Sequence, residues 1–256
     1  MLHGLAKGRR QLDDVGRAWR TLAETDPLWA ICVDPAGKNG RWDRLAFYAN
    51  GAGEVAEVMS RAEELRIPVR GRRALDFGCG AGRLTRPLAE RYELAVGVDI
   101  APEMLALAER DNPVADRCRF VRNTEPDLAL FADGEFDLVY STIVLQHLPR
   151  QLIRAYLAEF ARVVRPGGVV IVHLPTRPRL TPRGWCYRLL PPALLGLVQR
   201  RILGYPAPMR MHGLTEGEVR SLLAAGGVDV VAADPVDYQP DWRELRYFCV
   251  RRPPSR

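Results

Sequence analysis

The segment around residues 74–84 constrains the fold of this chain more than any other. A short apolar run ends at Phe77, and three glycines follow at alternate positions, Gly78, Gly80 and Gly82. Glycine reaches backbone angles that a Cβ penalises, and it lets a ligand approach the main chain. A helix starting just after such a turn directs unpaired N–H groups toward it. The segment predicts a strand, a ligand-binding turn and a helix, although such a turn can also be a plain connection.

Short apolar runs alternate with helical patterns from residue 73 onward, which is typical of βαβ units and a parallel sheet. We expect strands at 74–77, 94–99, 118–122, 136–141, 169–174, 228–233 and 244–250. We expect helices at 83–91, 102–111, 150–164 and 215–225. The chain is therefore predicted to be an α/β protein with a Rossmann-like, seven-stranded mixed sheet, helices on both faces and a C-terminal hairpin.

Two further regions flank or interrupt this pattern. Residues 1–71 predict an N-terminal helical cap with helices at 12–24 and 53–65, and its aromatic side chains would pack it onto the body: Trp19, Trp29, Trp42 and Phe47. Residues 72–256 form the predicted main domain. Within it, residues 175–213 break the strand and helix rhythm, and an insertion of this length is usually functional. We expect it to be a lid over an acceptor site.

Composition and charge narrow the class of protein. With 47% hydrophobic and 27% charged residues, the 256-residue chain resembles soluble globular proteins rather than disordered ones. The cysteines form no Cys-x-x-Cys pair, so we expect neither a disulfide framework nor a metal. We find no signal-peptide pattern and no run of about 20 apolar residues, and we expect a cytoplasmic protein. Seven arginines and no acidic residue lie between 176 and 210, where the net charge of +6 is concentrated.

Polar side chains follow several of the expected strands. Asp99 ends the second strand, where a carboxylate can accept both hydrogen bonds from a ribose diol. Ligands of open α/β sheets bind at the carboxyl ends of the strands. Asp76, Asp99 and Ser141 should therefore meet in one crevice, together with a ligand that carries a ribose.

Four segments together resemble the class I S-adenosylmethionine-dependent methyltransferases, in particular the group of ubiquinone and other small-molecule methyltransferases. They are LDFGCGAGRL at 75–84, GVDIAPEML at 97–105, FDLVYS at 136–141 with LQHL at 145–148, and RPGG at 165–168. The resemblance covers residues 72–174 well and the C-terminal part more weakly. The dinucleotide fingerprint of dehydrogenases fits less well, because its sixth position would be Arg83 or Thr85 instead of glycine or alanine.

The resemblance implies S-adenosylmethionine as the cofactor and S-adenosylhomocysteine as the product. Asp76 and the backbone of Gly78 and Gly80 would hold the methionine amino and carboxylate groups, and Asp99 would bind the ribose hydroxyls. The adenine would lie between apolar side chains and hydrogen-bond a polar one, with these assignments: Ile100 and Met104 for the ring faces, and Asn123 or Thr124 for the amine in place of the acidic residue common in the family. The expected cofactor site also includes Cys79, Gly82, Arg83 and Ser141.

A sulfonium methyl group is already activated, so the protein mainly aligns the acceptor and, for a hydroxyl, removes its proton. Histidine suits that role because its ordinary pKa is about 6.5. We expect His147 at the crevice rim, as the base or alternatively as a cap of the helix that begins near Pro149. His212 lies where the insertion rejoins the domain and would close over the acceptor. His173, inside the fifth strand, is expected to be a core or rim residue.

The sequence favours methyl transfer to a small-molecule acceptor, specifically O-methylation of a specialised metabolite that is acidic, glycosylated or amphiphilic. The arginines of the insertion suit an acidic molecule. Residues 189–203 suit an amphiphilic acceptor or peripheral contact with a membrane, or they form a lid whose leucines pack on the sheet. Nucleic-acid methylation is less favoured, because residues 137–140 lack the Asn/Asp-Pro-Pro-aromatic sequence and no RNA-binding module is visible. A non-catalytic cofactor-binding partner protein is a further alternative, and the oligomeric state is left open.

Overall fold

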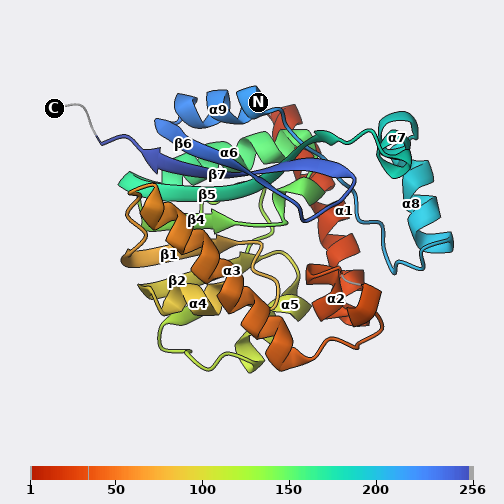
Figure 1. Ribbon diagram of the computed structural model, residues 1–256, viewed down its shortest axis with the longest axis horizontal. Helices are drawn as coiled ribbons and strands as arrows, with labels where there is room; N and C mark the ends of the chain where they lie inside the picture. The colour runs from red at the N-terminus through yellow and green to blue at the C-terminus, as the bar shows by residue number, and fades with distance from the viewer. Residues whose placement is uncertain (1, 34, 254–256) are drawn as a thin grey trace.

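The computed structural model describes residues 2–33 and 35–253 and contains a seven-stranded sheet with helices on both faces (Figure 1). Its strands are β1 (Gly71–Phe77), β2 (Tyr92–Asp99), β3 (Cys118–Arg122), β4 (Phe136–Ser141), β5 (Val164–Pro178), β6 (Val228–Val236) and β7 (Trp242–Arg251). Their order across the sheet is β3-β2-β1-β4-β5-β7-β6. Neighbours from β3 to β5 pair in parallel, whereas β7 is antiparallel to both β5 and β6. The predicted fold class is confirmed.

The described helices are α1 (Leu2–Thr25), α2 (Pro27–Ile31), α3 (Arg44–Glu64), α4 (Thr85–Ala89), α5 (Pro102–Arg110), α6 (Arg150–Val163), α7 (Pro182–Leu189), α8 (Pro192–Arg201) and α9 (Glu216–Ala225), with short 3-10 turns η1 (Pro35–Gly37) and η2 (Leu145–His147). Helices α1 and α3 are longer than the expected 12–24 and 53–65. Helix α4 is shorter than the expected 83–91, because residues 80–84 belong to the glycine turn.

Strand β5 continues to Pro178, beyond the position at which we expected the insertion to begin. The reason is its pairing with β7, which extends as far as the Pro178 and Trp242 partners. The inserted residues also form two helices, α7 and α8, where the sequence pattern indicated a single short apolar stretch.

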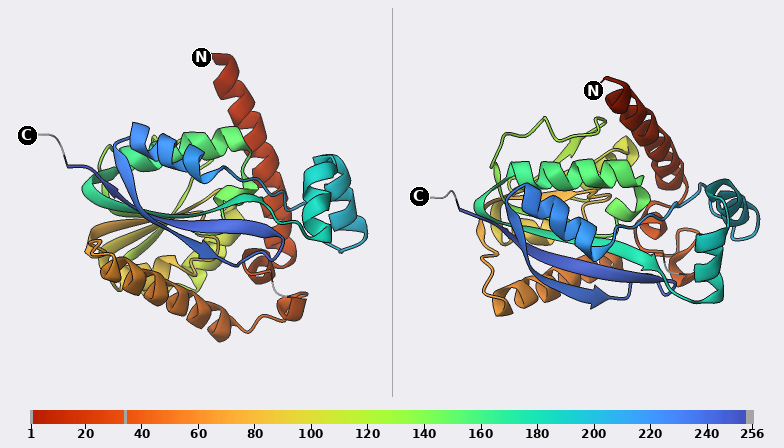
Figure 2. Two further views of the ribbon diagram at one scale, coloured as in Figure 1. Left: turned by 45° about the horizontal axis from the view of Figure 1, so that its top comes forward. Right: turned by 90° about the horizontal axis from the view of Figure 1, so that it is seen from above.

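The sheet separates two hydrophobic cores. Ala74 of β1 packs with residues of α3 and α4, while its neighbours Leu75 and Phe77 pack with residues of α6 and α9. Successive side chains of a strand point to opposite faces. Figures 1 and 2 show α3 lying along one face and α6 and α9 along the other. Since both faces are covered, the parallel strands are continuous apolar runs in the sequence.

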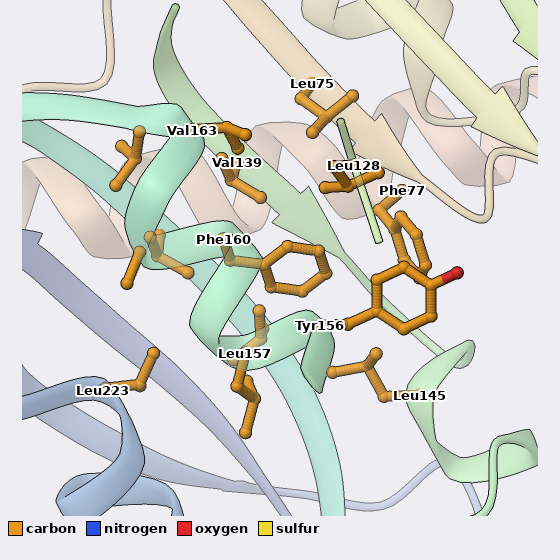
Figure 3. Packing of buried hydrophobic residues seen from close by; sticks show 14 of the residues in the cluster. Leu75, Phe77, Leu128, Val139, Leu145, Tyr156, Leu157, Phe160, Val163 and Leu223 are labelled. Carbon is orange, nitrogen blue, oxygen red and sulfur yellow. The ribbon is translucent and has the colours of Figure 1, made fainter. Parts of the chain in front are cut away.

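Aromatic side chains anchor α6 under the ends of the central strands (Figure 3). The rings of Phe160 and Phe77 meet edge to face with their centroids 5.1 Å apart, and Tyr156 lies 4.5 Å from Phe77. The Tyr156 hydroxyl donates to the carbonyl of Glu125 at 2.8 Å. These contacts position the segment between β4 and α6 at the carboxyl edge of the sheet.

Helix α1 lies across that edge. A Cβ at Gly16 would be only 2.9 Å from Cδ1 of Ile100, which follows β2, so the helix approaches the strand end closely. Within the described residues, no helix is both long and apolar enough to cross a membrane. The same part of the chain holds no group of three or more His, Cys, Asp or Glu side chains placed to hold a metal ion, and its five cysteines are free thiols.

The substitution Phe160→Ala should destabilise the fold by about 3–5 kcal/mol, because it leaves a cavity between α6 and β1. Phe160 is fully buried, whereas Leu130 is 43% exposed, so Leu130→Ala should change stability by less than about 0.5 kcal/mol. Urea unfolding followed by circular dichroism measures both. Equal effects of the two substitutions would contradict the central position of Phe160.

Candidate active site

The glycine turn after β1 is fastened to the end of β2 by main-chain hydrogen bonds. The N–H groups of Gly78 and Cys79 donate to the carbonyl of Val98, at 2.7 and 3.0 Å. Gly78 has a φ of +76°, and a Cβ there would lie 2.3 Å from the side chain of Val144. Both the backbone angle and the available space therefore require glycine. The turn presents bare main chain at the carboxyl edge of the sheet.

Asp99 connects this turn to the start of α5. One carboxylate oxygen accepts the N–H of Gly80 and the other accepts the N–H of Ala101, both at 2.9 Å. Burial raises the pKa of Asp99, while these backbone hydrogen bonds oppose that rise. A carboxylate has about four lone-pair sites, so each oxygen keeps acceptor capacity after binding one N–H.

A cavity opens beside the turn and Asp99. It is lined by nine of the residues that the sequence analysis selected: Gly78, Cys79, Gly80, Arg83, Asp99, Ile100, Met104, Asn123 and His147. The structure thus brings most of the predicted cofactor residues to one place.

Four other predicted cofactor residues do not line this cavity. Asp76 is buried behind the turn, where its carboxylate accepts the Thr85 hydroxyl at 2.6 Å, and burial raises its pKa to about 7. The Ser141 hydroxyl donates to the carbonyl of Phe77. Thr124 is exposed, and Gly82 takes a φ of +75° against Phe120. In the structure these four residues shape the strand ends and the turn.

Asn123 lines the cavity, but its side chain is engaged locally. Its amide NH₂ donates to the carbonyls of Glu125 and Asp127, and its amide oxygen accepts the N–H of Glu125. Its backbone N–H donates to the carbonyl of Asp99. The main contribution of Asn123 in the structure is therefore to hold the loop after β3.

Sequence reasoning did not predict that the N-terminal helices roof the cavity. Leu12, Val15 and Trp19 of α1 and Ile31 of α2 all line it. Leu12, Val15 and Trp19 follow the spacing of one helix face, and that spacing is the signal in the sequence. However, helical spacing alone does not say which surface a helix covers.

His147 lies in η2 at the rim of the cavity and is buried against Trp19, with ring centroids 5.1 Å apart. Its Nδ1 is 2.9 Å from the carbonyl oxygen of Arg210. A carbonyl only accepts, so Nδ1 carries the proton and Nε2 is the acceptor nitrogen, with the amide nitrogen of Gln146 at 3.4 Å. Burial lowers the pKa of His147 to about 4. The alternative role as a helix cap is wrong, because α6 begins after Pro149 without a side-chain cap.

His173 and His212 lie outside the cavity. His212 does not line the cavity or the cleft beside it, and its backbone N–H donates to the carbonyl of Gln146 at 2.7 Å. His212 therefore lines neither hollow in this structure, where its backbone is hydrogen-bonded to η2, and its role at the acceptor stays a prediction. Burial lowers the pKa of His212, with Arg210 adding to the effect.

His173 of β5 is buried and supports the loop that carries His147. Its Nδ1 accepts the N–H of Ile143 at 3.3 Å, and its Nε2 faces Glu244 at 3.4 Å. Ile143 has a φ of +60°, which is strained for a β-branched residue. The other carboxylate oxygen of Glu244 accepts the N–H of Gln239. His173 thus links the strained loop to the turn between β6 and β7.

A second hollow of about 900 Å³, which we call the acceptor cleft, adjoins the cavity. Ile31, Arg83, Ile143 and His147 line both. One wall of the cleft is apolar and aromatic, formed by residues of the insertion: Tyr187, Leu203, Tyr205, Met209 and Met211.

The opposite wall of the cleft carries a charged cluster around Glu54 of α3. Glu54 pairs with the buried Arg83 at 2.8 Å and accepts the Tyr238 hydroxyl at 2.6 Å. Arg246 of β7 contacts the Tyr238 hydroxyl and lies 3.6 Å from Glu54. The Nε atoms of Arg83 and Arg246 are buried without a hydrogen-bond partner. Glu54, Tyr238 and Arg246 line the cleft, so this wall offers charged and polar side chains to a ligand.

His147 should remain neutral to an unusually low pH. Its folded pKa of about 4 lies below the ordinary value near 6.5, so protonation favours the unfolded chain as the pH falls between these values. Nuclear magnetic resonance of the ring nitrogens at pH 6 should show a neutral, Nδ1-protonated ring. In His147→Gln, stability should fall less over this pH window, by up to about 3 kcal/mol. A His147 titration midpoint near 6.5 would contradict the burial argument.

Comparison with known proteins agrees with this geometry. Residues 75–172, from β1 into β5, match the family described as "Methyltransferase domain". Ubiquinone biosynthesis O-methyltransferase of Azorhizobium caulinodans is 34% identical over 157 residues, which cover 59% of this chain and 60% of that protein. 2-Methyl-6-phytyl-1,4-hydroquinone methyltransferase of Synechocystis sp. is 35% identical over 103 residues, covering 40% of this chain and 31% of that protein.

The chain spans about half the length of most curated relatives that it matches. Among solved structures, magnesium protoporphyrin IX methyltransferase of Synechocystis, with bound S-adenosylhomocysteine, superposes with a TM-score of 0.57 at 21% identity. That superposition covers 88% of this chain and 93% of the other, and it shows a shared fold. The match to the methyltransferase domain falls on the strands and turns that build the cavity, and the chain shares the fold of a methyltransferase that binds S-adenosylhomocysteine.

Proposed function

We propose that this chain binds S-adenosylmethionine in the cavity beside the glycine turn and methylates a hydroxyl oxygen of an amphiphilic small molecule in the acceptor cleft. The position of His147 carries this proposal, because it lines both hollows where they meet. The cofactor supplies an electrophilic sulfonium methyl group, and S-adenosylhomocysteine is the product.

The residues around the cavity fit such a cofactor. Asp99 has acceptor capacity left for two ribose hydroxyls, and its orientation is held by backbone N–H groups on both oxygens. Ile100 and Met104 offer apolar surface for the adenine ring. The bare main chain at Gly78 and Gly80 leaves room that a Cβ would take.

His147 is oriented to remove the acceptor proton. The hydrogen bond from Nδ1 to the Arg210 carbonyl leaves Nε2 as the basic nitrogen. The lowered pKa keeps that nitrogen unprotonated at neutral pH. The protein then has to align the acceptor hydroxyl with the methyl group and accept its proton at Nε2.

The acceptor cleft suits a ring with polar substituents and an apolar tail. The aromatic and methionine side chains of the insertion form one wall, and the cluster of Glu54, Tyr238 and Arg246 forms the other. The names of two relatives refer to ubiquinone and to a phytylated hydroquinone. Both molecules have a ring with polar substituents and an apolar tail. We therefore favour a quinol-type or other phenolic acceptor.

Replacing Asp99 by alanine should weaken the binding of S-adenosylhomocysteine by about 1.5–3 kcal/mol, the magnitude expected for hydrogen bonds to a charged group. Isothermal titration calorimetry measures the affinity. Thr124→Ala is the matched control, because Thr124 is exposed and does not line the cavity. An unchanged affinity in Asp99→Ala would rule out the ribose assignment.

Replacing His147 by alanine should lower kcat by about 10²–10⁴, the usual contribution of a general base, with cofactor affinity nearly unchanged. His212→Ala should retain activity, because His212 does not reach either hollow. The assay follows a labelled methyl group from the cofactor into a panel of prenylated quinols and catechols by mass spectrometry. Full activity of His147→Ala would assign this residue a structural role only.

The same assay separates the alternatives. Transfer of label to RNA and not to any small molecule would support a nucleic-acid methyltransferase. Binding of S-adenosylhomocysteine without turnover on any acceptor would support a non-catalytic partner protein. Activity on the quinol panel whose acid limb lies near pH 4 would agree with the pKa of His147.

A further inference from the structure

Residues 177–210, which we call the α7–α8 segment, expose large apolar side chains to an unusual degree. Leu180 and Leu189 are each 71% exposed, and Ile202 is 75% exposed. Most of the exposed large apolar side chains in the described chain belong to this segment: Leu180, Trp185, Leu189, Leu194, Leu197, Ile202 and Leu203. Such a concentration marks a contact surface, since isolated apolar residues elsewhere need no explanation.

Helices α7 and α8 expose large apolar side chains, whereas helices that pack on a core bury them. The buried residues of α7 and α8 are glycines, Gly184 and Gly196, while Leu189, Leu194 and Leu197 are exposed. Figures 1 and 2 show both helices at the periphery, beyond the end of the long strands β5 and β7. The expectation that the leucines of this segment pack on the sheet is therefore wrong. Their apolar surface is left for something outside the chain.

The same segment is strongly cationic. It contains seven arginines and no acidic residue: Arg177, Arg179, Arg183, Arg188, Arg200, Arg201 and Arg210. Among the described residues, Arg179 alone of these seven forms an ion pair, with Asp237. Arg188 donates to the carbonyl of Pro178 and lies near the ring of Trp185. The remaining positive charge is not neutralised by neighbouring carboxylates.

We propose that the α7–α8 segment docks on the surface of an anionic lipid bilayer. Apolar side chains interleaved with arginines are the composition that binds at the boundary of headgroups and acyl chains. The leucines would enter the bilayer surface, and the guanidinium groups would pair with lipid phosphates. Docking of this kind goes beyond methyl transfer and does not depend on it.

Charge favours a bilayer over a second copy of the chain. In a symmetric dimer the same patch faces itself, so the unpaired arginines of both copies would lie close together. Like charges in a shared interface repel each other. An anionic surface complements them, and it also covers the exposed leucines, which a nucleic acid would leave in water.

Docking would also place the acceptor cleft at the membrane. Tyr187, Gln199, Leu203 and Tyr205 belong to the segment and line that cleft. An acceptor with a lipid tail could then enter the cleft without leaving the bilayer. This consequence rests on the proposed function, whereas binding to vesicles is measured without cofactor or acceptor.

The test is sedimentation of the full chain with vesicles of phosphatidylcholine alone and of phosphatidylcholine mixed with phosphatidylglycerol. We expect binding to the mixed vesicles that weakens as the salt concentration rises. The triple variant Arg183→Gln, Arg200→Gln and Arg201→Gln should bind them about a hundredfold more weakly, roughly fivefold per arginine. The matched control replaces three exposed, unpaired arginines elsewhere: Arg66→Gln, Arg70→Gln and Arg119→Gln.

A second triple variant tests the apolar contribution. Leu189→Ser, Leu197→Ser and Ile202→Ser should weaken binding to the mixed vesicles about tenfold or more. Its control replaces exposed apolar residues on other faces: Leu45→Ser, Leu130→Ser and Val231→Ser. Calorimetric affinity for S-adenosylhomocysteine should be the same in all four variants, which shows that each is folded and that vesicle binding is a separate property.

Three outcomes would overturn the proposal. The first is no binding to the mixed vesicles, and the second is equal loss of binding in a triple variant and its control. The third is a dimer in analytical ultracentrifugation that the Leu189, Leu197 and Ile202 replacements dissolve, because the surface would then join two copies. Vesicle binding by a chain that methylates no acceptor would contradict the proposed function alone.

Discussion

The shape of the cavity beside the glycine turn depends on the carboxylate of Asp99. This carboxylate accepts one backbone N–H from the turn after β1 and another from the start of α5, so it fixes two strand ends relative to each other. The carbonyl of Val98 adds two hydrogen bonds to the same turn. All of these donors are backbone N–H groups, which nearly every residue has. These hydrogen bonds therefore do not require a particular side chain in the turn. Helix α1 packs closely against Ile100, next to Asp99, and the loop after β4 packs against the glycine turn.

Features that depend on local pattern could be predicted from the sequence. The expected strands 118–122 and 136–141 coincide with β3 and β4, because strands buried on both faces are uninterrupted apolar runs between turns. The glycine turn could also be predicted from the sequence, because the positive φ and the close packing at Gly78 leave few alternatives to glycine. Gly78, Gly80 and Asp99 could be assigned to the cavity for the same reason, because they follow or end predicted strands.

Features that depend on contacts between distant segments could not be predicted. The contact of Trp19 with His147 joins α1 to η2, and no local spacing indicates it. The α7–α8 segment shows the same limit, because an apolar helical pattern does not say whether its leucines face the sheet or the solvent. Here Gly184 lies against the backbone of Arg179 and Gly196 against Pro208, so the glycines are buried by contacts within the segment.

The burial of His147 affects both its orientation and its strength as a base. Its surroundings are the Arg210 carbonyl, the Trp19 ring and Gln146, with no carboxylate to stabilise an imidazolium, and the low pKa follows from this. In the proposed methyl transfer, the sulfonium charge of the cofactor would be lost from the adjoining cavity as His147 gained a proton. The total charge of the buried site would then stay the same, so the full cost of creating an isolated buried cation would not arise. Under this proposal, a base that is weak in the empty cavity would suffice, because the methyl donor carries its own positive charge.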